Sequence, residues 1–221
     1  MNKRLAYFDI NRSRGRKIVR ETLTDKFKGV LISDFYGVYF NLPYRKQKCL
    51  VHLLREFHDC AKRDNSAEYQ ENYKKIKRLI HDALRLQKRH SDIDKIAYLR
   101  RVAAIKQRLF DFMTRPYKNK NLIRLSKRFS KFWLDMFTFL QDPTIAWNNN
   151  MAERMIRPNV IYRNRSFGNR SMQSAKAHAT MMSMIQTLIL QKQNVGQFLR
   201  TTYVAHRQGD MASRLTPILL S

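Results

Sequence analysis

Hydrophobic residues recur along this chain with two different periods. Short apolar runs at residues 5–10, 29–33 and 48–51 are typical of strands, and residues 13–23 have the spacing of a helix. Asp34 directly follows the second apolar run. Because strands alternate with helices, the pattern predicts an α/β core, in which ligands bind at the carboxyl ends of the strands.

From about Ser66 to Leu140 the pattern is helical and contains no glycine. It predicts three amphipathic helices, with a capping box of Ser91 and Asp94 at the start of the second and a break after Arg115. The predicted core positions are Ile76, Leu79, Ile80, Ala83, Leu84, Leu86, then Ile96, Leu99, Val102, Ala103, Ile105, Leu109, and finally Phe132, Trp133, Met136, Phe137 and Phe139.

The fold class expected is α/β, mostly helical by content. Three further helices are predicted over residues 150–156, 175–191 and 195–204. We expect four parts along the chain. They are the first part of the core (1–64), a helical insertion (65–142), the second part of the core (143–205) and a tail (206–221).

Charge narrows the class of partner. The chain has 44 lysines and arginines against 17 acids, a formal charge of +27, which favours a polyanionic partner through counterion release. A ribosomal or membrane-surface protein could share this composition. No apolar run is long enough for a signal peptide or a membrane span, and two cysteines cannot build a disulfide framework. We therefore expect a cytoplasmic protein that binds nucleic acid.

Two acids stand where metal-dependent chemistry could use them. Asp34 ends a strand, and Glu153 lies in the basic, asparagine-rich stretch NNNMAERMIRP. Carboxylates of this kind hold Mg²⁺, and two such ions assist phosphoryl transfer by activating the attacking oxygen and stabilising the leaving one. The alternative is that Asn150 and Glu153 form only a capping box at a helix start.

Three motifs carry a family resemblance. The run Asn149–Pro158, NNMAERMIRP, resembles the N-N-x-A-E-R-x-x-R-P signature around the catalytic Glu of insertion sequence family 66 transposases. The stretch GVLISDFYGVY resembles that family's strand with the second catalytic Asp, which falls on Asp34. CLVH, Cys49–His52, resembles the C-x-x-H signature of DDE transposases that have helical insertions.

The resemblance implies a ribonuclease-H-like core, here incomplete, with a large all-helical insertion between the second Asp and the Glu. It implies DNA cleavage and strand transfer, with Asp34 and Glu153 as catalytic ligands of Mg²⁺ or Mn²⁺. Element ends and target DNA are the implied partners in a bacterial, nucleoid-associated protein. Self-association and accessory transposition proteins are further candidates. No membrane partner is implied.

Other residues gain roles from the same resemblance. His52, Cys49, Asn149 and Asn150 are expected to support the site, although helix capping explains the asparagines equally well, and a structural role explains His52 equally well. The candidate DNA-binding residues are Arg154, Arg157, Arg163, Arg165, Arg170, Arg14, Arg16 and Lys17.

One member of the family's acidic triad has no counterpart in this sequence. The first catalytic Asp belongs to an opening strand, whereas residues 5–10 match the third strand, and Asp9 precedes Asp34 by too few residues to replace it. We therefore expect an N-terminally truncated chain that is inactive alone.

Three alternatives stay open. A zinc site formed by Cys49, His52, His58 and Cys60 is disfavoured by its spacing. A catalytically inactive, basic DNA-binding remnant could modulate a full-length transposase. A helical RNA-binding protein, in which both acids are surface residues, is the third.

Overall fold

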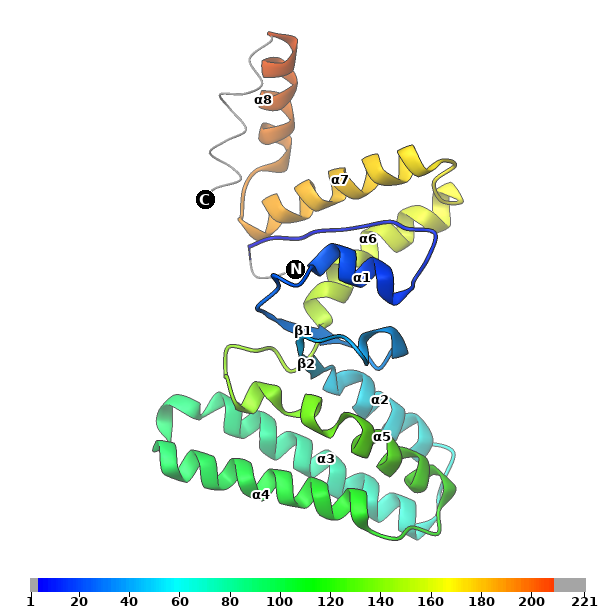
Figure 1. Ribbon diagram of the computed structural model, residues 1–221, viewed down its shortest axis with the longest axis vertical. Helices are drawn as coiled ribbons and strands as arrows, with labels where there is room; N and C mark the ends of the chain where they lie inside the picture. The colour runs from blue at the N-terminus through cyan, green and yellow to red at the C-terminus, as the bar shows by residue number, and fades with distance from the viewer. Residues whose placement is uncertain (1–3, 209–221) are drawn as a thin grey trace. The chain divides into compact units, whose positions relative to one another are not determined.

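A computed structural model describes residues 4–208 of the chain (Figure 1). This part is mostly helical with two short strands, which confirms the mostly helical content predicted from the sequence. It forms two compact units. We call Gly15–Met151 the core unit and residues 4–14 with 152–208 the terminal unit. The predicted boundaries of the four parts stay a prediction, and residues 209–221 of the predicted tail lie outside the described residues.

Two parallel strands lie near the start of the core unit. In their register Val30 pairs with Arg45 and Ser33 pairs with Lys48. The helix expected at 13–23 and the strand expected at 29–33 are confirmed. The elements in order are α1 (Arg16–Leu23), β1 (Val30–Ser33), the 3₁₀ turn η1 (Gly37–Tyr39) and β2 (Arg45–Lys48).

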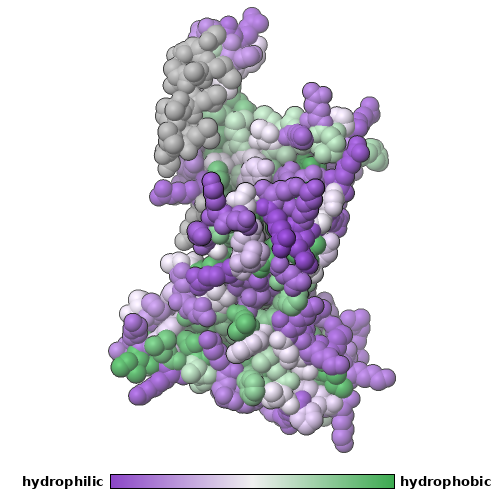
Figure 2. Space-filling view, viewed as in Figure 1, coloured by the Kyte–Doolittle hydropathy of each residue, from purple (hydrophilic) through white to green (hydrophobic). Residues whose placement is uncertain are grey.

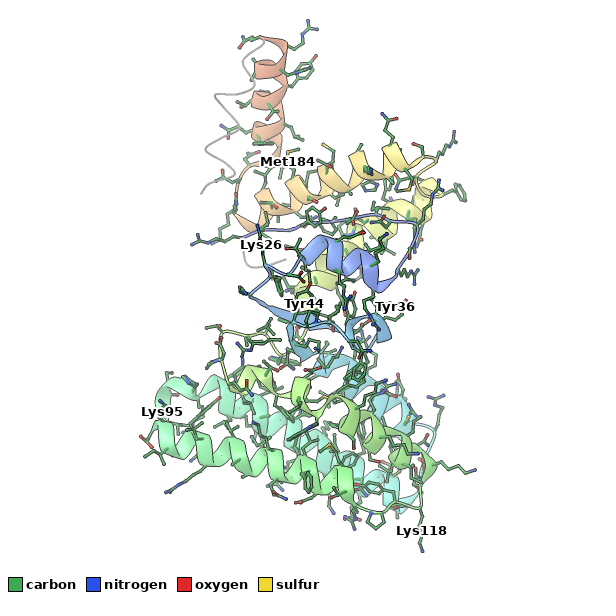
Figure 3. The ribbon with its side chains drawn as sticks, viewed as in Figure 1. Lys26, Tyr36, Tyr44, Lys95, Lys118 and Met184 are labelled. Carbon is green, nitrogen blue, oxygen red and sulfur yellow. The ribbon has the colours of Figure 1, made fainter. Side chains whose placement is uncertain are left out.

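The strand predicted at residues 48–51 is wrong in position. β2 ends at Lys48, and the apolar run after it begins helix α2 (Leu50–Ala61). The reason is that Leu50 and Phe57, seven residues apart, are buried on the same face of that helix. This spacing is that of a helix and not of a strand. Before β2, Tyr44 donates a hydrogen bond to the Thr24 carbonyl at 3.1 Å and so ties the strand to the end of α1 (Figure 3).

The predicted helical block is confirmed as a bundle that shares one hydrophobic core with α2. Helices α3, α4 and α5 lie side by side in Figure 1. Hydrophilic side chains cover most of the face seen in Figure 2, as expected for charge-rich helices. The bundle elements are α3 (Ala67–Lys88), η2 (His90–Asp92), α4 (Lys95–Thr114), α5 (Lys120–Met136) and η3 (Thr138–Leu140).

The predicted core face of α4 is partly wrong. Ile96 and Leu99 are 62% and 55% exposed, and Ala103 is also exposed. Tyr98 is buried instead, and its hydroxyl donates a hydrogen bond to the Leu140 carbonyl at 2.9 Å. This contact holds the Tyr98 side of α4 against the rest of the bundle. Val102, Ile105 and Leu109 are buried as predicted.

Two local predictions in the bundle are also wrong. Asp94, and not Ser91, caps α4, because its carboxylate accepts the backbone N–H groups of Ile96 and Ala97. Trp133 is 41% exposed, although its neighbours Phe132 and Met136 are buried as expected, because α5 turns Trp133 away from the core. Leu84 is half-buried against the core.

The terminal unit consists of three helices and an extended segment. The helices predicted here are confirmed as α6 (Asn150–Ser166), α7 (Met172–Leu190) and α8 (Val195–Arg207). Residues 5–10 are extended but form no strand, so that prediction is wrong. Their N–H groups find hydroxyls instead: Ala6 donates to Thr187 Oγ1 at 3.1 Å and Phe8 donates to Ser183 Oγ at 2.8 Å, which fixes the segment along α7 (Figure 1). Neither strand of the described chain pairs with it.

Candidate functional site

Asp34 lies immediately after β1, as the sequence predicts, and is half-buried. Its Oδ1 accepts the N–H of Tyr36 at 3.0 Å, a turn that fixes the carboxylate at the carboxyl end of the strand. Burial raises the pKa of the nearby Tyr39 hydroxyl, and the negative charge of Asp34 raises it further. Asp34 therefore presents a locally oriented carboxylate beside a tyrosine that stays protonated at neutral pH.

A buried lysine holds the same strand end. Lys48 is fully buried, and its Nζ donates to Ser33 Oγ at 3.0 Å and to the Asp34 carbonyl at 2.9 Å. The ammonium also lies 5.0 Å from the ring centre of Phe132, where the aromatic face attracts a cation. Burial lowers the pKa of Lys48, while Asp135 and Asp34 oppose that shift. Lys48 thus fixes the backbone of the candidate metal ligand.

The buried ammonium of Lys48 predicts a pH-dependent stability. Its pKa is lower in the folded than in the unfolded chain, so between those two values the unfolded chain binds more protons and wild-type stability rises with pH. A Lys48→Met variant lacks this gain. We expect its stability relative to the wild type to fall as pH rises from 7 toward about 10.5, in urea unfolding followed by circular dichroism. Lys26→Met, at an exposed lysine, is the control. A relative stability that increases with pH would contradict this role.

The start of α2 brings two distant segments of the core unit together. Cys49 donates its N–H to the Ser33 carbonyl at 2.8 Å, directly before Asp34. The next residue, Leu50, donates to the Trp147 carbonyl at 3.1 Å. The cap residue and the first residue of α2 therefore hold the strand end that carries Asp34 and the segment that leads into the asparagine-rich motif.

Asn149, in that second segment, has a buried oxygen with unmet hydrogen-bonding capacity. Its Oδ1 has no hydrogen-bond partner among the described residues. A buried acceptor of this kind is costly unless something outside the chain binds it. The preceding side chain, Asn148, accepts the N–H of Asn150 at 3.0 Å and so orders the start of α6. Asn148, which sequence analysis did not select, therefore forms the turn that leads into α6, and Asn149 Oδ1 caps no N–H among the described residues.

Glu153 occupies the first turn of α6, as predicted, and is half-buried. It is the sole acidic residue between Asp142 and Asp210, in a stretch rich in arginine. Glu153 and Asp34 belong to different units, so their shared site stays a prediction. The helix continues through Pro158 to Ser166, beyond the end predicted at residue 156.

The histidines and cysteines do not assemble a zinc site. Cys60 is buried near the end of α2, where Arg124 Nη2 lies 3.3 Å from its Sγ, and His58 Nδ1 lies 3.1 Å from the Tyr73 hydroxyl. Cys49 is buried at the start of α2, and His52 is half-buried one turn on. Between residues 4 and 208 no group of three or more His, Cys, Asp or Glu side chains could hold a metal.

The donor set of the core unit suits a hard divalent cation. Asp34 contributes carboxylate oxygens and Asn149 an unused carboxamide oxygen, which are ligand types that Mg²⁺ and Mn²⁺ accept. Soft sulfur is absent from this pair. The ligand types of these two side chains therefore fit the cation that the sequence predicts, and their joining in one site with Glu153 stays a prediction.

The candidate DNA-binding residues are all exposed. Seven of them make no ion pair with an acid anywhere in residues 4–208, and Lys17 lies 3.8 Å from Glu21 on α1. Exposed guanidinium groups without acidic partners are available to phosphate. The seven are Arg14, Arg16, Arg154, Arg157, Arg163, Arg165 and Arg170.

Sequence analysis missed Gln47 and Lys48. Both are fully buried, yet they belong to the strand RKQK, which has no apolar residue. Gln47 Nε2 donates to the Met136 carbonyl at 2.8 Å, and its Oε1 accepts the N–H of Phe139, so it joins β2 to the end of α5. Their burial depends on the register of the two strands, in which Gln47 pairs with Ile32 and Lys48 pairs with Ser33, and the sequence alone carries no signal of it.

None of the helices within residues 4–208 is both long and apolar enough to cross a bilayer. Comparisons with curated proteins and with solved structures found no match. A family model described as "Transposase IS66 family" matches residues 1–177, which include both candidate acids and all three motifs. The chain therefore belongs to the IS66 family of transposases.

Proposed function

We propose that this chain is the catalytic region of a DDE transposase that cuts and joins DNA. Asp34 and Glu153 would hold divalent cations, Mg²⁺ or Mn²⁺, in a ribonuclease-H-like arrangement. The cations would activate the attacking oxygen and stabilise the leaving one. In a bacterial cell such a protein works on the nucleoid, where the element ends and the target DNA lie.

The observation that carries the proposal is the pair of backbone hydrogen bonds at the start of α2. The N–H of Cys49 donates to the carbonyl of Ser33, the residue before Asp34. The N–H of Leu50 donates to the carbonyl of Trp147, six positions before Glu153. Six residues of chain reach at most about 22 Å even when extended, and the helical turn at α6 shortens that reach. The chain thus limits how far Glu153 can lie from the strand end.

Other residues have supporting roles in the proposal. Lys48 fixes the backbone of Asp34 through its contact with the carbonyl. Asn149 offers its buried oxygen to the cation or to a water in its shell. Cys49 packs beneath the strand end, and His52 positions a phosphate. Arg154, next to Glu153, neutralises phosphate charge without competing for the metal.

A DDE site needs a third acid, and the proposal assigns only two. The proposal does not use Asp9, an exposed residue of the extended segment whose Oδ2 accepts a hydrogen bond from Asn11 at 2.6 Å. We therefore expect full activity only when a further acidic ligand is supplied.

Hydroxyl-radical mapping tests the shared site without requiring catalysis. Fe²⁺ replaces Mg²⁺ in such sites, and with ascorbate and peroxide it cuts the peptide backbone close to its ligands. We expect cuts near Asp34 and near Glu153 that excess Mg²⁺ suppresses together. The variant Glu153→Gln should lose both cuts. Cutting at Asp34 that persists unchanged in that variant would show that the two acids do not share a cation.

A second function is supported by the seven exposed arginines without acidic partners. The chain could bind DNA without cutting it and so modulate an active transposase. Gel shift on DNA in Mg²⁺ and in chelator separates the two functions. The binding function is favoured if the chain binds DNA equally well in Mg²⁺ and in chelator. It also requires that no metal-dependent nicking appears after a third acidic ligand is supplied.

A further inference from the structure

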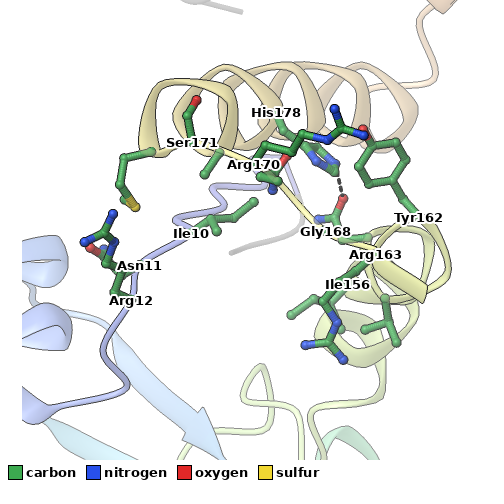
Figure 4. A pocket seen from close by; sticks show the side chains of 15 residues that line it. Ile10, Asn11, Arg12, Ile156, Tyr162, Arg163, Gly168, Arg170, Ser171 and His178 are labelled. Carbon is green, nitrogen blue, oxygen red and sulfur yellow. Dashed lines mark hydrogen bonds between the residues drawn. The ribbon is translucent and has the colours of Figure 1, made fainter. Parts of the chain in front are cut away.

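A cavity of about 430 Å³ lies wholly within the terminal unit (Figure 4). It is lined by α6, the start of α7, the loop between them and residues 10–12 of the extended segment. Its volume falls within the range of about 300–1,000 Å³ that is typical of small-ligand sites. The proposed metal chemistry uses none of its residues.

Three arginines line this cavity. Arg12, Arg163 and Arg170 are exposed, and none of them pairs with an acid among the residues described. Arg170 lies with Tyr162 on one side of the cavity, and Arg12 lies on the other (Figure 4). No carboxylate lines the cavity. A cavity with exposed guanidinium groups and no carboxylate on its lining suits phosphate groups, each of which a guanidinium can bind through two parallel hydrogen bonds.

The rest of the lining mixes apolar and aromatic side chains with uncharged polar ones, among them the amide of Asn159. Tyr162 packs edge-on against His178 with ring centres 4.4 Å apart, and Ile156 lies nearby on α6. His178 Nε2 lies 3.1 Å from Asn159 Oδ1 and donates to it. The Nδ2 protons of Asn159 have no acceptor among residues 4–208, so they can bind the edge of a ligand. Flat apolar surface, an edge donor and a phosphate site together match a nucleotide.

The loop beside the cavity contains an aromatic residue that the fold does not use. Phe167 is 99% exposed and has a φ of 57°, in the left-handed region that disfavours residues other than glycine. Gly168 follows at φ 90° and lines the cavity. An almost fully solvated phenyl ring contributes little packing energy to the described part of the chain, so the ring is available to contact a partner. Exposed rings at DNA-binding surfaces stack on bases or insert between them.

We propose that the terminal unit binds an unpaired DNA nucleotide. The cavity holds the nucleotide, with its phosphate on the arginines and its base against Tyr162, Ile156 and Asn159, while Phe167 stacks on the neighbouring base. This inference rests on the proposed DNA partner and adds a preference for unpaired over paired DNA. It is independent of the cation site.

Fluorescence anisotropy tests it in chelator, so that no metal contributes. The probes are a labelled oligothymidylate and a perfectly paired duplex of the same length. We expect Phe167→Ala to weaken binding of the single strand roughly tenfold, the size of one lost stacking contact, and to change binding of the duplex little. Phe167→Trp should retain binding. Arg163→Ala should weaken binding of both probes, because phosphate contacts do not depend on pairing.

Folding is not at risk in the key variant, because the Phe167 ring touches solvent almost entirely. Unchanged single-strand binding in Phe167→Ala, with Arg163→Ala weakened, would overturn the nucleotide site and leave only a phosphate-binding surface. Failure of the wild type to bind either probe would overturn both this inference and the DNA partner. A single-strand preference lost in Phe167→Ala supports the inference even if radical mapping disproves the shared cation site.

Discussion

Asp34→Asn is expected to lower the affinity of the chain for Mn²⁺ by at least about a hundredfold, measured from the free-ion signal in electron paramagnetic resonance. The substitution keeps the shape of the side chain and its turn to Tyr36, but it removes the negative charge that a hard cation requires. Glu153→Gln should cause a similar loss. Because one site needs both ligands, the double variant should bind no more weakly than the weaker single variant.

Asp9→Asn and Asp25→Asn are matched controls for these acids. Both aspartates are exposed and stand outside the proposed site, so each change should leave Mn²⁺ affinity unaltered. If the losses from Asp34→Asn and Glu153→Gln add up in the double variant, the two acids act at independent cation sites. A loss in Asp9→Asn would make that residue a ligand, against the proposal.

Phe57→Ala is expected to destabilise the core unit more than any surface change. The ring is fully buried on α2, and its centre lies 5.7 Å from that of Phe129 and 6.1 Å from that of Phe112. Removing it leaves a cavity at the meeting point of three helices, which costs about 3–5 kcal/mol of unfolding free energy. Domains are commonly stable by only about 5–15 kcal/mol, so much of the stability is lost. Urea unfolding followed by circular dichroism at 222 nm measures it.

Phe110→Ala on α4 removes the same number of atoms from a ring that is 50% exposed. We expect it to cost well below half as much, since half of the ring already faces water. Equal losses in Phe57→Ala and Phe110→Ala would mean that the core does not pack as the structure describes.

The helical bundle could be predicted because its signal is local and repeated. In α3, Ile76, Leu79 and Ala83 are buried at the spacing that the sequence gives. The buried face of α4 was less predictable, since apolar residues lie on more than one side. Tyr98 is buried there because its hydroxyl reaches the Leu140 carbonyl, a partner 42 residues away. The spacing of apolar residues along the sequence does not predict such a contact.

The extended segment was misread for a related reason. An apolar run at residues 5–10 predicts a strand only if another strand pairs with it, and here the partners of Ala6 and Phe8 are hydroxyls of α7. Ser183 and Thr187 are four residues apart on one helix face, a spacing that matches alternate residues of an extended chain only after folding.

The candidate acids could be predicted from motifs, but their surroundings could not. Asp34 follows a strand, and Glu153 stands in a family signature, so both were identifiable from sequence. Lys48 was not, because a lysine in a basic strand predicts a solvated side chain. Lys48 is buried because it pairs with Ser33 in the parallel register of the two strands. That pairing places its ammonium within hydrogen-bonding distance of Ser33 Oγ at the end of β1. The sequence likewise does not predict the buried, unbonded oxygen of Asn149. That oxygen depends on the folded path of its segment, in which the Trp147 carbonyl accepts the N–H of Leu50.

Anomalous X-ray diffraction from a crystal soaked in Mn²⁺ tests the central claim most directly. The account predicts an anomalous peak within ligand distance, about 2.0–2.6 Å, of a carboxylate oxygen of Asp34 and of one of Glu153. Peaks bound by only one of these acids, or the two carboxylates facing away from each other with no cation between them, would contradict it.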